Sequence, residues 1–127
     1  VTPDEDYVGY NLTNAITKGQ NNEALEILQG LLDKGEKPSV LLAILINQYR
    51  RMLQARVSSL PLNELASAMG VKPYAITVAK NLSQKYTQVE LKNIVDKLHN
   101  LEYAFKSGIT DDKEALLQAF AILLKKS

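Results

Sequence analysis

The side chains best suited to acid–base or metal chemistry are few in this sequence: one histidine and two pairs of aspartates. The pairs are Asp4 with Asp6 and Asp111 with Asp112, and His99 is the single imidazole. Two close carboxylates could share a proton or bind a metal ion, and an imidazole could act as a general base. Both pairs stand where a helix is expected to begin, and helix N-termini favour negative charge. We therefore interpret the aspartates as capping residues and His99 as a solvated side chain on a polar helix face.

Two glycines have the spacing of a phosphate-binding loop without its chemistry. Gly30 and Gly35 fit G-x-x-x-x-G, but Glu36-Lys37 follow where such a loop needs Lys-Ser/Thr to hold phosphate and magnesium. Cysteine is absent, which excludes disulfides and thiolate metal ligands. The sequence thus predicts no catalytic residue, no metal site and no cofactor, and we do not expect this chain to be an enzyme by itself.

The strongest local motif is segment 62–79, which has the layout of a helix-turn-helix. Ala66 is small where two helices would cross, Gly70 stands at the turn, and Ile76 would hold the second helix against the first. If that second helix entered the major groove of DNA, its outward side chains would be Lys72, Tyr74, Thr77, Lys80 and Asn81. They include no arginine, and only Asn81 suits bidentate contacts with a base. A DNA-binding helix-turn-helix domain of the transcription-regulator type is therefore kept as the alternative function.

The elements that carry these residues all have a helical period, and no stretch alternates polar with apolar residues as a strand would. The sequence predicts an all-α fold, a compact bundle of about seven helices with short connections. The expected helices are 2–18 (with Thr2 as its cap), 23–34 (after an Asn21-Asn22 cap), 38–56, 62–69, 73–86, 87–107 and 111–126.

Helix ends are marked by several local signals. Thr87 with Glu90 and Asp111 with Glu114 fit the capping box, and Asn21-Asn22 are expected to cap the second helix. Glycines 19, 35, 70 and 108 are expected to end helices, since glycine adopts the left-handed conformation without strain.

The helix expected from Pro38 to Arg56 changes character at Asn47. From Val40 to Ile46 it is apolar on every face, so other elements should surround it. Beyond Asn47 we expect one apolar side and one polar side, so that this half is partly surface. Gln48, Arg50 and Arg51 lie here and have no capping duty, which makes them our first prediction for a surface that faces a partner.

Length and charge bound the kind of protein. The chain has 127 residues, the size of one ordinary domain, and a net charge of +1. Residues 1–36 carry seven acids and two bases, residues 37–88 one acid and seven bases, and residues 89–127 six of each, giving sums of −5, +6 and 0. The basic third could bind nucleic acid or consist of solvated helix faces. No signal peptide or membrane span is recognisable, which favours the cytoplasm. Because the chain begins with Val and a helix starts at once, we expect a fragment of a longer protein.

The order of these parts resembles the C-terminal domain of the delta subunit of bacterial DNA polymerase III, a component of the sliding-clamp loader. The similarity covers nearly the whole chain. Its clearest portions are 41–50 (Leu-Leu-Ala-Ile-Leu-Ile-Asn-Gln-Tyr-Arg), the Ala-x-x-x-Gly turn that leads into 71–74 (Val-Lys-Pro-Tyr), and 103–108 (Tyr-Ala-Phe-Lys-Ser-Gly) followed by two aspartates.

The resemblance implies an architectural role. In that family, this helical domain joins those of the other loader subunits, tau/gamma and delta-prime, in a collar, while an AAA+-like N-terminal part engages the sliding clamp. The fragment is thus expected neither to bind the clamp nor to hydrolyse nucleotide, and DNA contact within the assembled loader stays open. Residues that match the family pattern, and so are expected at a partner interface, are Gln48, Arg50, Pro73, Tyr74 and Lys106. Lys106 could equally pair with Glu102 four residues earlier.

Overall fold

The computed structural model describes the backbone of residues 3–124 and the side chains of residues 8–124. Within these residues the chain forms seven helices and no strand, as the sequence predicts. The helices are α1 Pro3–Thr17, α2 Asn21–Asp33, α3 Pro38–Val57, α4 Leu62–Met69, α5 Pro73–Ser83, α6 Gln88–Lys106 and α7 Asp112–Leu124. The expected cap Thr2, the side chains of Asp4 and Asp6, and the expected basic end at 125–126 lie outside the described residues.

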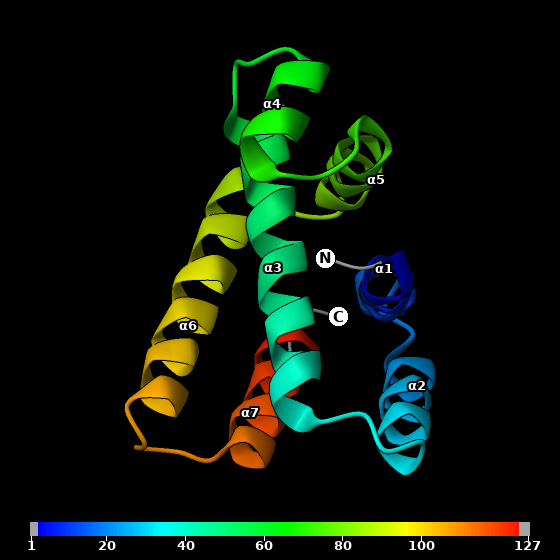
Figure 1. Cartoon of the computed structure of the whole chain (residues 1–127), viewed down its shortest axis with the longest axis vertical. Helices are drawn as coiled ribbons and strands as arrows, with labels where there is room; N and C mark the ends of the chain where they lie inside the picture. Colours follow the sequence, from blue (N-terminus) through cyan, green and yellow to red (C-terminus); the bar gives the residue numbers. More distant parts are fainter. Residues whose placement is uncertain (1–2, 125–127) are drawn as a thin grey trace.

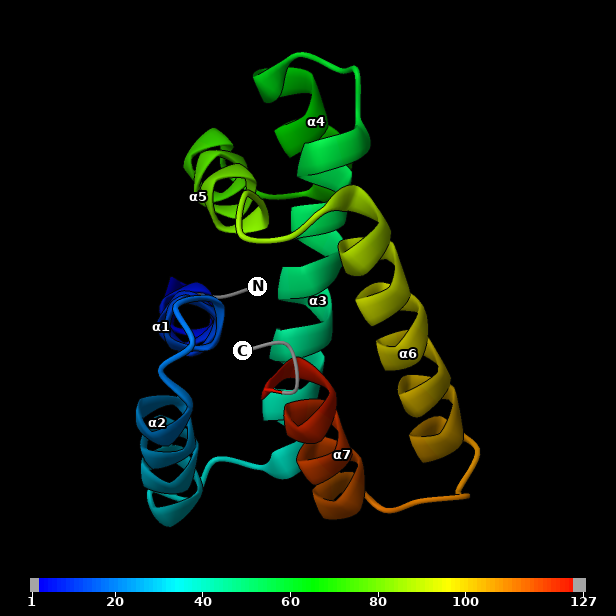
Figure 2. The ribbon, with the colours of Figure 1, turned by 180° about the vertical axis from the view of Figure 1, so that it is seen from behind.

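Helix α3 is the centre of the fold. It packs against α1, α5, α6 and α7, and it stands between α6 on one side and α1, α2 and α5 on the other (Figures 1 and 2). Pro38 occupies its first turn, where the missing N–H costs nothing, and Ser58 ends it in an extended conformation. Helix α7 lies behind α3 in Figure 1 and packs against both α3 and α6.

The two halves of α3 are buried more evenly than the sequence predicts. In the first half, Ala43 is exposed, so this half is not surrounded on every face. In the second half, five residues are buried: Gln48, Tyr49, Arg51, Met52 and Ala55. The expectation that this half is partly surface is confirmed, since Asn47 and Gln54 are exposed. Gln48 and Arg51, which were expected on its polar side, are nevertheless buried.

The predicted helix ends are confirmed in part. Thr87 and Glu90 form both bonds of the capping box of α6. At α7, Oδ1 of Asp111 accepts the N–H of Glu114 at 2.8 Å, while the Glu114 carboxylate accepts a bond from Gln118 rather than closing the box. Asn21 does not cap α2, which begins at Asn21 itself after Gln20 without a side-chain cap bond.

The core is one continuous cluster to which every helix contributes. Leu25 of α2, Leu62 of α4 and Leu117 of α7 are apolar but 45%, 45% and 49% exposed. Other apolar residues of the same helices, such as Leu28, Leu65 and Leu116, are buried. Only one side of each outer helix meets the bundle, so some of its apolar residues remain at the surface.

Gly30 within α2 and Gly35 just beyond its end should respond in opposite directions to alanine. Gly30 lies within the helix and a Cβ there would meet no atom within 4 Å, so Gly30→Ala should stabilise the protein by about 0.5–1 kcal/mol. Gly35 has a φ of +93°, so Gly35→Ala should destabilise it by about 1 kcal/mol. Urea unfolding of the two variants measures both changes. Changes of the same sign would contradict the assigned backbone conformations.

Candidate partner interface

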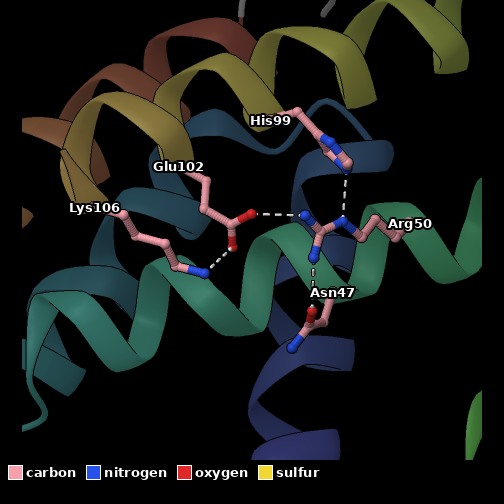
Figure 3. Close-up of polar contacts among 5 residues, drawn as sticks. All are labelled: Asn47, Arg50, His99, Glu102 and Lys106. Atoms are coloured by element: carbon pink, nitrogen blue, oxygen red, sulfur yellow. Dashed lines mark hydrogen bonds and ion pairs between the residues drawn. The ribbon is translucent and has the colours of Figure 1, made fainter.

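Arg50 joins α3 to α6 through two contacts and makes a third within α3 (Figure 3). Its Nη2 donates to Oε1 of Glu102 at 2.7 Å, and its Nε donates to Nε2 of His99 at 2.7 Å. A longer bond of 3.5 Å runs from Nη1 to Oδ1 of Asn47, one turn earlier on α3. His99 and Glu102 are three residues apart on α6, so both point from one helix face toward the same guanidinium.

Glu102 is the shared acceptor of this cluster. Its second oxygen, Oε2, lies 3.5 Å from Nζ of Lys106, which confirms the i, i+4 pair that the sequence suggested. Partial burial by itself raises the pKa of the Glu102 carboxyl. The hydrogen bond and charge of Arg50, together with Lys106, outweigh this effect, so the pKa lies below its ordinary value of 4.5.

His99 is exposed, but it is not only solvated as expected. Because the guanidinium Nε always carries hydrogen, Nε2 of His99 must accept the bond and its proton lies on Nδ1. This bond gives His99 a role in orienting the Arg50 side chain.

Glu102→Gln should lower the free energy of unfolding by about 1 kcal/mol near neutral pH, because a half-buried ion pair is lost. Since the folded pKa of Glu102 lies below 4.5, its contribution is present above about pH 4.5 and disappears as pH falls through the folded value. Wild type and variant should thus converge in urea unfolding as the pH is lowered below 4.5 and the Glu102 carboxylate is protonated.

The matched control is Asp96→Asn. Asp96 pairs with Lys92 four residues earlier, and both side chains are more than half exposed. This change should cost less than about 0.5 kcal/mol. Equal losses in the two variants, or a difference between Glu102→Gln and wild type that persists in acid, would contradict the role given to Arg50 and Glu102.

Gln48 and Arg51 are not surface residues. They are 5% and 6% exposed, and Nη1 of Arg51 lies 3.5 Å from Oε1 of Gln48. A Cβ added at Gly9 of α1 would lie 3.0 Å from Ile44 and 3.6 Å from Oε1 of Gln48, so α1 crosses α3 closely at this point. The prediction that Gln48, Arg50 and Arg51 have no local structural role is wrong, because all three bind or pack within the bundle.

The predicted residues of α5 lie elsewhere. Pro73, Tyr74, Lys72, Thr77, Lys80 and Asn81 are all exposed. Ala66 and Ile76 are buried, and Gly70 has a φ of +70°, so α4 and α5 pack as the motif suggests. Helices α5 and α6 lie on opposite sides of α3 (Figures 1 and 2). The structure therefore brings Arg50 and Lys106 together and separates them from Pro73 and Tyr74.

Sequence reasoning missed the role of Arg56. Its Nη1 donates to the backbone carbonyls of Ser83 and Tyr86, both at 2.7 Å, and so ties the end of α3 to the segment between α5 and α6. The only signal in the sequence was a basic residue in the last turn of a helix, which is too common to indicate this contact.

Among the described residues, no group of three or more His, Cys, Asp or Glu side chains is placed to hold a metal ion. No helix within residues 3–124 combines the length and apolar character needed to cross a membrane.

Comparison with known proteins assigns the chain to a family. The family described as "DNA polymerase III delta subunit, C-terminal domain" matches residues 8–124. The chain belongs to this family. DNA polymerase III subunit delta of Bacillus subtilis (strain 168) is 29% identical over 120 residues, which cover 92% of this chain and 34% of that protein. The chain thus spans about a third of the length of this curated relative.

The fold of the delta C-terminal domain is also the fold seen here. The solved structure of the Bacillus subtilis DNA clamp loader delta protein (YqeN) matches with a TM-score of 0.83 and 26% identity, over 98% of this chain and 38% of that one. The resemblance inferred from the sequence is therefore confirmed. The pair α4–α5 is part of a delta C-terminal domain, and the alternative of a helix-turn-helix transcription regulator is not favoured.

Proposed function

We propose that this domain is a non-catalytic assembly domain, the collar part of a DNA polymerase III delta subunit. In this proposal it joins the other subunits of the sliding-clamp loader, tau/gamma and delta-prime, in the bacterial cytoplasm during DNA replication. The observation that carries the proposal is the match of the seven-helix fold to a clamp loader delta protein at a TM-score of 0.83. Contact with the sliding clamp is assigned to an AAA+-like N-terminal part of such a subunit.

The residues whose types could serve in catalysis have structural roles instead, which supports the non-catalytic assignment. Asp111 caps α7, His99 accepts a bond from Arg50, and Gly30 lies inside α2. These three residues, each of which could suggest an active site, are thus explained by the fold.

We assign the partner interface to the side of the bundle where α3 meets the second half of α6. Arg50 is held in place there by Glu102 and His99, so little side-chain freedom would be lost on binding. On α6, beside Glu102, the side chain of Lys106 is exposed and Tyr103 is 70% exposed. Tyrosine and arginine are the residue types that most often dominate protein–protein interfaces. Gln48 and Arg51 would support this side from within the bundle, without touching the partner.

Co-elution with the remaining loader subunits in size-exclusion chromatography tests the proposal. We expect the protein to join those subunits, and Tyr103→Ala with Lys106→Ala to weaken the association at least about tenfold. Tyr74→Ala is the matched control, because Tyr74 is as exposed as Tyr103 but lies on α5, across α3. If the unmodified protein does not associate, the assembly role is wrong. If only Tyr74→Ala weakens association, the assigned side is wrong.

A further inference from the structure

Helices α1, α2, α4 and α6 end with the same backbone motif. In each, a glycine with a positive φ follows the helix, and its N–H donates to a carbonyl three residues back. The next N–H donates to a carbonyl five residues back, which makes this the Schellman motif. At the end of α6, the bonds run from Gly108 to Phe105 at 3.1 Å and from Ile109 to Ala104 at 2.9 Å. The residue after the glycine is thus turned back over the last turn of its helix.

Ile109 differs from the three residues in the same place at the other helix ends. Gln20 and Glu36 are polar and exposed. Val71 is apolar but packs against the core. Ile109 is apolar as well, yet it is 75% exposed, more than any other large hydrophobic side chain of the described residues. The turn leaves most of Ile109 in water, so its apolar surface can contact another molecule.

Tyr103 belongs to the same surface as Ile109. In the Schellman motif, the residue after the glycine commonly packs toward the residues five and six positions earlier, which here are Ala104 and Tyr103. Tyr103 is itself 70% exposed. Its neighbours one turn away on α6 are polar and exposed: His99, Asn100, Lys106 and Ser107. An apolar centre inside a polar rim is the usual anatomy of a protein–protein contact.

The charges beside this apolar pair do not balance (Figure 3). Arg50 and Lys106 are both cationic, and within residues 8–124 Glu102 is the one carboxylate that forms an ion pair with either. Oε1 of Glu102 lies 2.7 Å from Nη2 of Arg50, whereas Oε2 lies 3.5 Å from Nζ of Lys106. The ammonium has three N–H donors and its side chain is 69% exposed, so it can bind a second carboxylate. A partner that fits this site brings negative charge.

We propose that Tyr103 and Ile109 form the apolar centre of the partner interface, and that a neighbouring loader subunit contacts them with a helix. This helix inserts one aliphatic side chain between the tyrosine ring and Ile109, and one turn away it offers an Asp or Glu carboxylate to Lys106. A helix suits the site because Lys106 itself lies one turn from Tyr103. The proposal rests on the assembly role given above, and it adds Ile109 and the chemistry of the partner's surface.

Isothermal titration calorimetry of the protein with the remaining loader subunits tests the apolar centre. Ile109→Ser should weaken association at least about tenfold. Val89→Ser is the matched control and should change nothing, because Val89 is an aliphatic residue that is 69% exposed at the opposite end of α6. Ile109→Ser combined with Tyr103→Ala should cost less than the product of the two single losses, because both residues surround one partner side chain.

A charge reversal tests the carboxylate of the partner. Lys106→Glu should weaken association at least about tenfold at low salt, and less at high salt, where the attraction is screened. Lys106→Arg, which keeps the charge, should retain most of the affinity. Lys92→Glu is the control, because Lys92 also pairs with a carboxylate four residues away and is 60% exposed. Equal losses in Lys106→Glu and Lys92→Glu would show that only net charge matters and would overturn this part of the proposal.

Failure of the proposal can be distinguished from failure of the assembly role. If the unmodified protein does not bind the subunits, the assembly role is wrong and the proposal falls with it. If the unmodified protein binds and Ile109→Ser binds equally well, the proposal alone is wrong. A dimer of the protein by itself that Ile109→Ser dissolves would identify a second copy of the chain as the occupant. Ile109→Ser should leave the midpoint of urea unfolding unchanged, and a lower midpoint would instead make Ile109 a residue that stabilises the turn.

Discussion

Replacing Leu45 with alanine is expected to lower the free energy of unfolding by about 3 kcal/mol, the largest effect of any single leucine truncation considered. Leu45 is fully buried near the middle of α3. Because α3 is contacted by α1, α5, α6 and α7, no single neighbour can move inward to fill the space without disturbing the others. The cavity therefore remains, and its cost adds to the lost transfer free energy of the side chain.

The control is the same chemical change at the surface. Leu25 of α2 is 45% exposed, so Leu25→Ala removes less apolar area from the core and should cost about 1 kcal/mol or less. Urea unfolding followed by circular dichroism measures both variants. The m-value, the slope of unfolding free energy against urea concentration, should stay unchanged if both substitutions act on the folded state. Similar losses at the two positions would contradict the central place of α3.

A loss of about 3 kcal/mol is large beside the usual 5–15 kcal/mol of a domain. It should also loosen the surface that we assign to partner binding, since Arg50 is carried by the same helix. Leu45→Ala is thus expected to weaken subunit association more than its distance from the surface suggests, with the helices still formed in circular dichroism.

Local features of the fold could be predicted from the sequence because they depend on residues a few positions apart. The capping box of Thr87 and Glu90, the pair of Glu102 with Lys106, and the proline at the start of α3 all belong to this class. The period of the apolar residues also predicts which residues of α6 are buried, since that helix has one clear stripe.

Contacts between distant residues could not be predicted in this way. Arg50 meets His99 and Glu102 across 49 and 52 residues of sequence, and a helical period does not say which helix faces which. The same holds for Gln48 and Arg51, whose polarity suggested a surface. Gly9 was the available signal, because a glycine inside a helix permits the close crossing of α1 that buries them.

The candidate interface could be predicted only in part, because the sequence does not show which helices lie side by side. Family resemblance named Arg50, Lys106, Pro73 and Tyr74 together, but only the arrangement of α5 and α6 around α3 separates them into two sides. A sequence pattern shows that a residue has no local duty. It does not show which other residues share its face.

Tyr49 and Tyr86 make the bundle sensitive to alkaline pH. Their hydroxyls lie 2.8 Å apart, and their rings meet edge to face with centroids 5.9 Å apart. Burial raises the pKa of Tyr49 well above 10.0, and the neighbouring Tyr86 raises it further. Burial also raises the pKa of Tyr86, although its bond to Tyr49 acts in the opposite direction. Both phenols therefore stay protonated in the folded protein at a pH where the unfolded chain has lost these protons.

The sign of the pH dependence follows from this difference. Above about pH 10 the unfolded chain binds fewer protons than the folded protein, so stability is present below that pH and falls as pH rises. Each tyrosine that stays protonated only when folded contributes a slope of about 1.4 kcal/mol per pH unit. With two such residues, the protein should lose stability almost twice as steeply as with one.

Tyr49→Phe should lower the stability at neutral pH but make it less sensitive to pH above about pH 10. Near neutral pH it should destabilise the protein by about 1–2 kcal/mol, because the hydroxyl of Tyr86 loses a buried partner. Above about pH 10 it should lose stability more slowly than wild type, so that the two curves approach each other. Urea unfolding between about pH 7 and about pH 11 measures the difference, and absorbance of tyrosinate identifies the groups that ionise.

Tyr103→Phe removes a hydroxyl that is largely exposed, and it should leave both the neutral stability and the alkaline slope unchanged. If Tyr49→Phe instead follows the wild-type slope above about pH 10, then Tyr49 ionises freely in the folded protein. The segment between α5 and α6 would in that case open in alkali before the bundle unfolds, although Arg56 holds the carbonyls of Ser83 and Tyr86. Parallel slopes together with early tyrosinate absorbance would identify that local opening, whereas converging slopes identify Tyr49 and Tyr86 as a pair that ionises only on global unfolding.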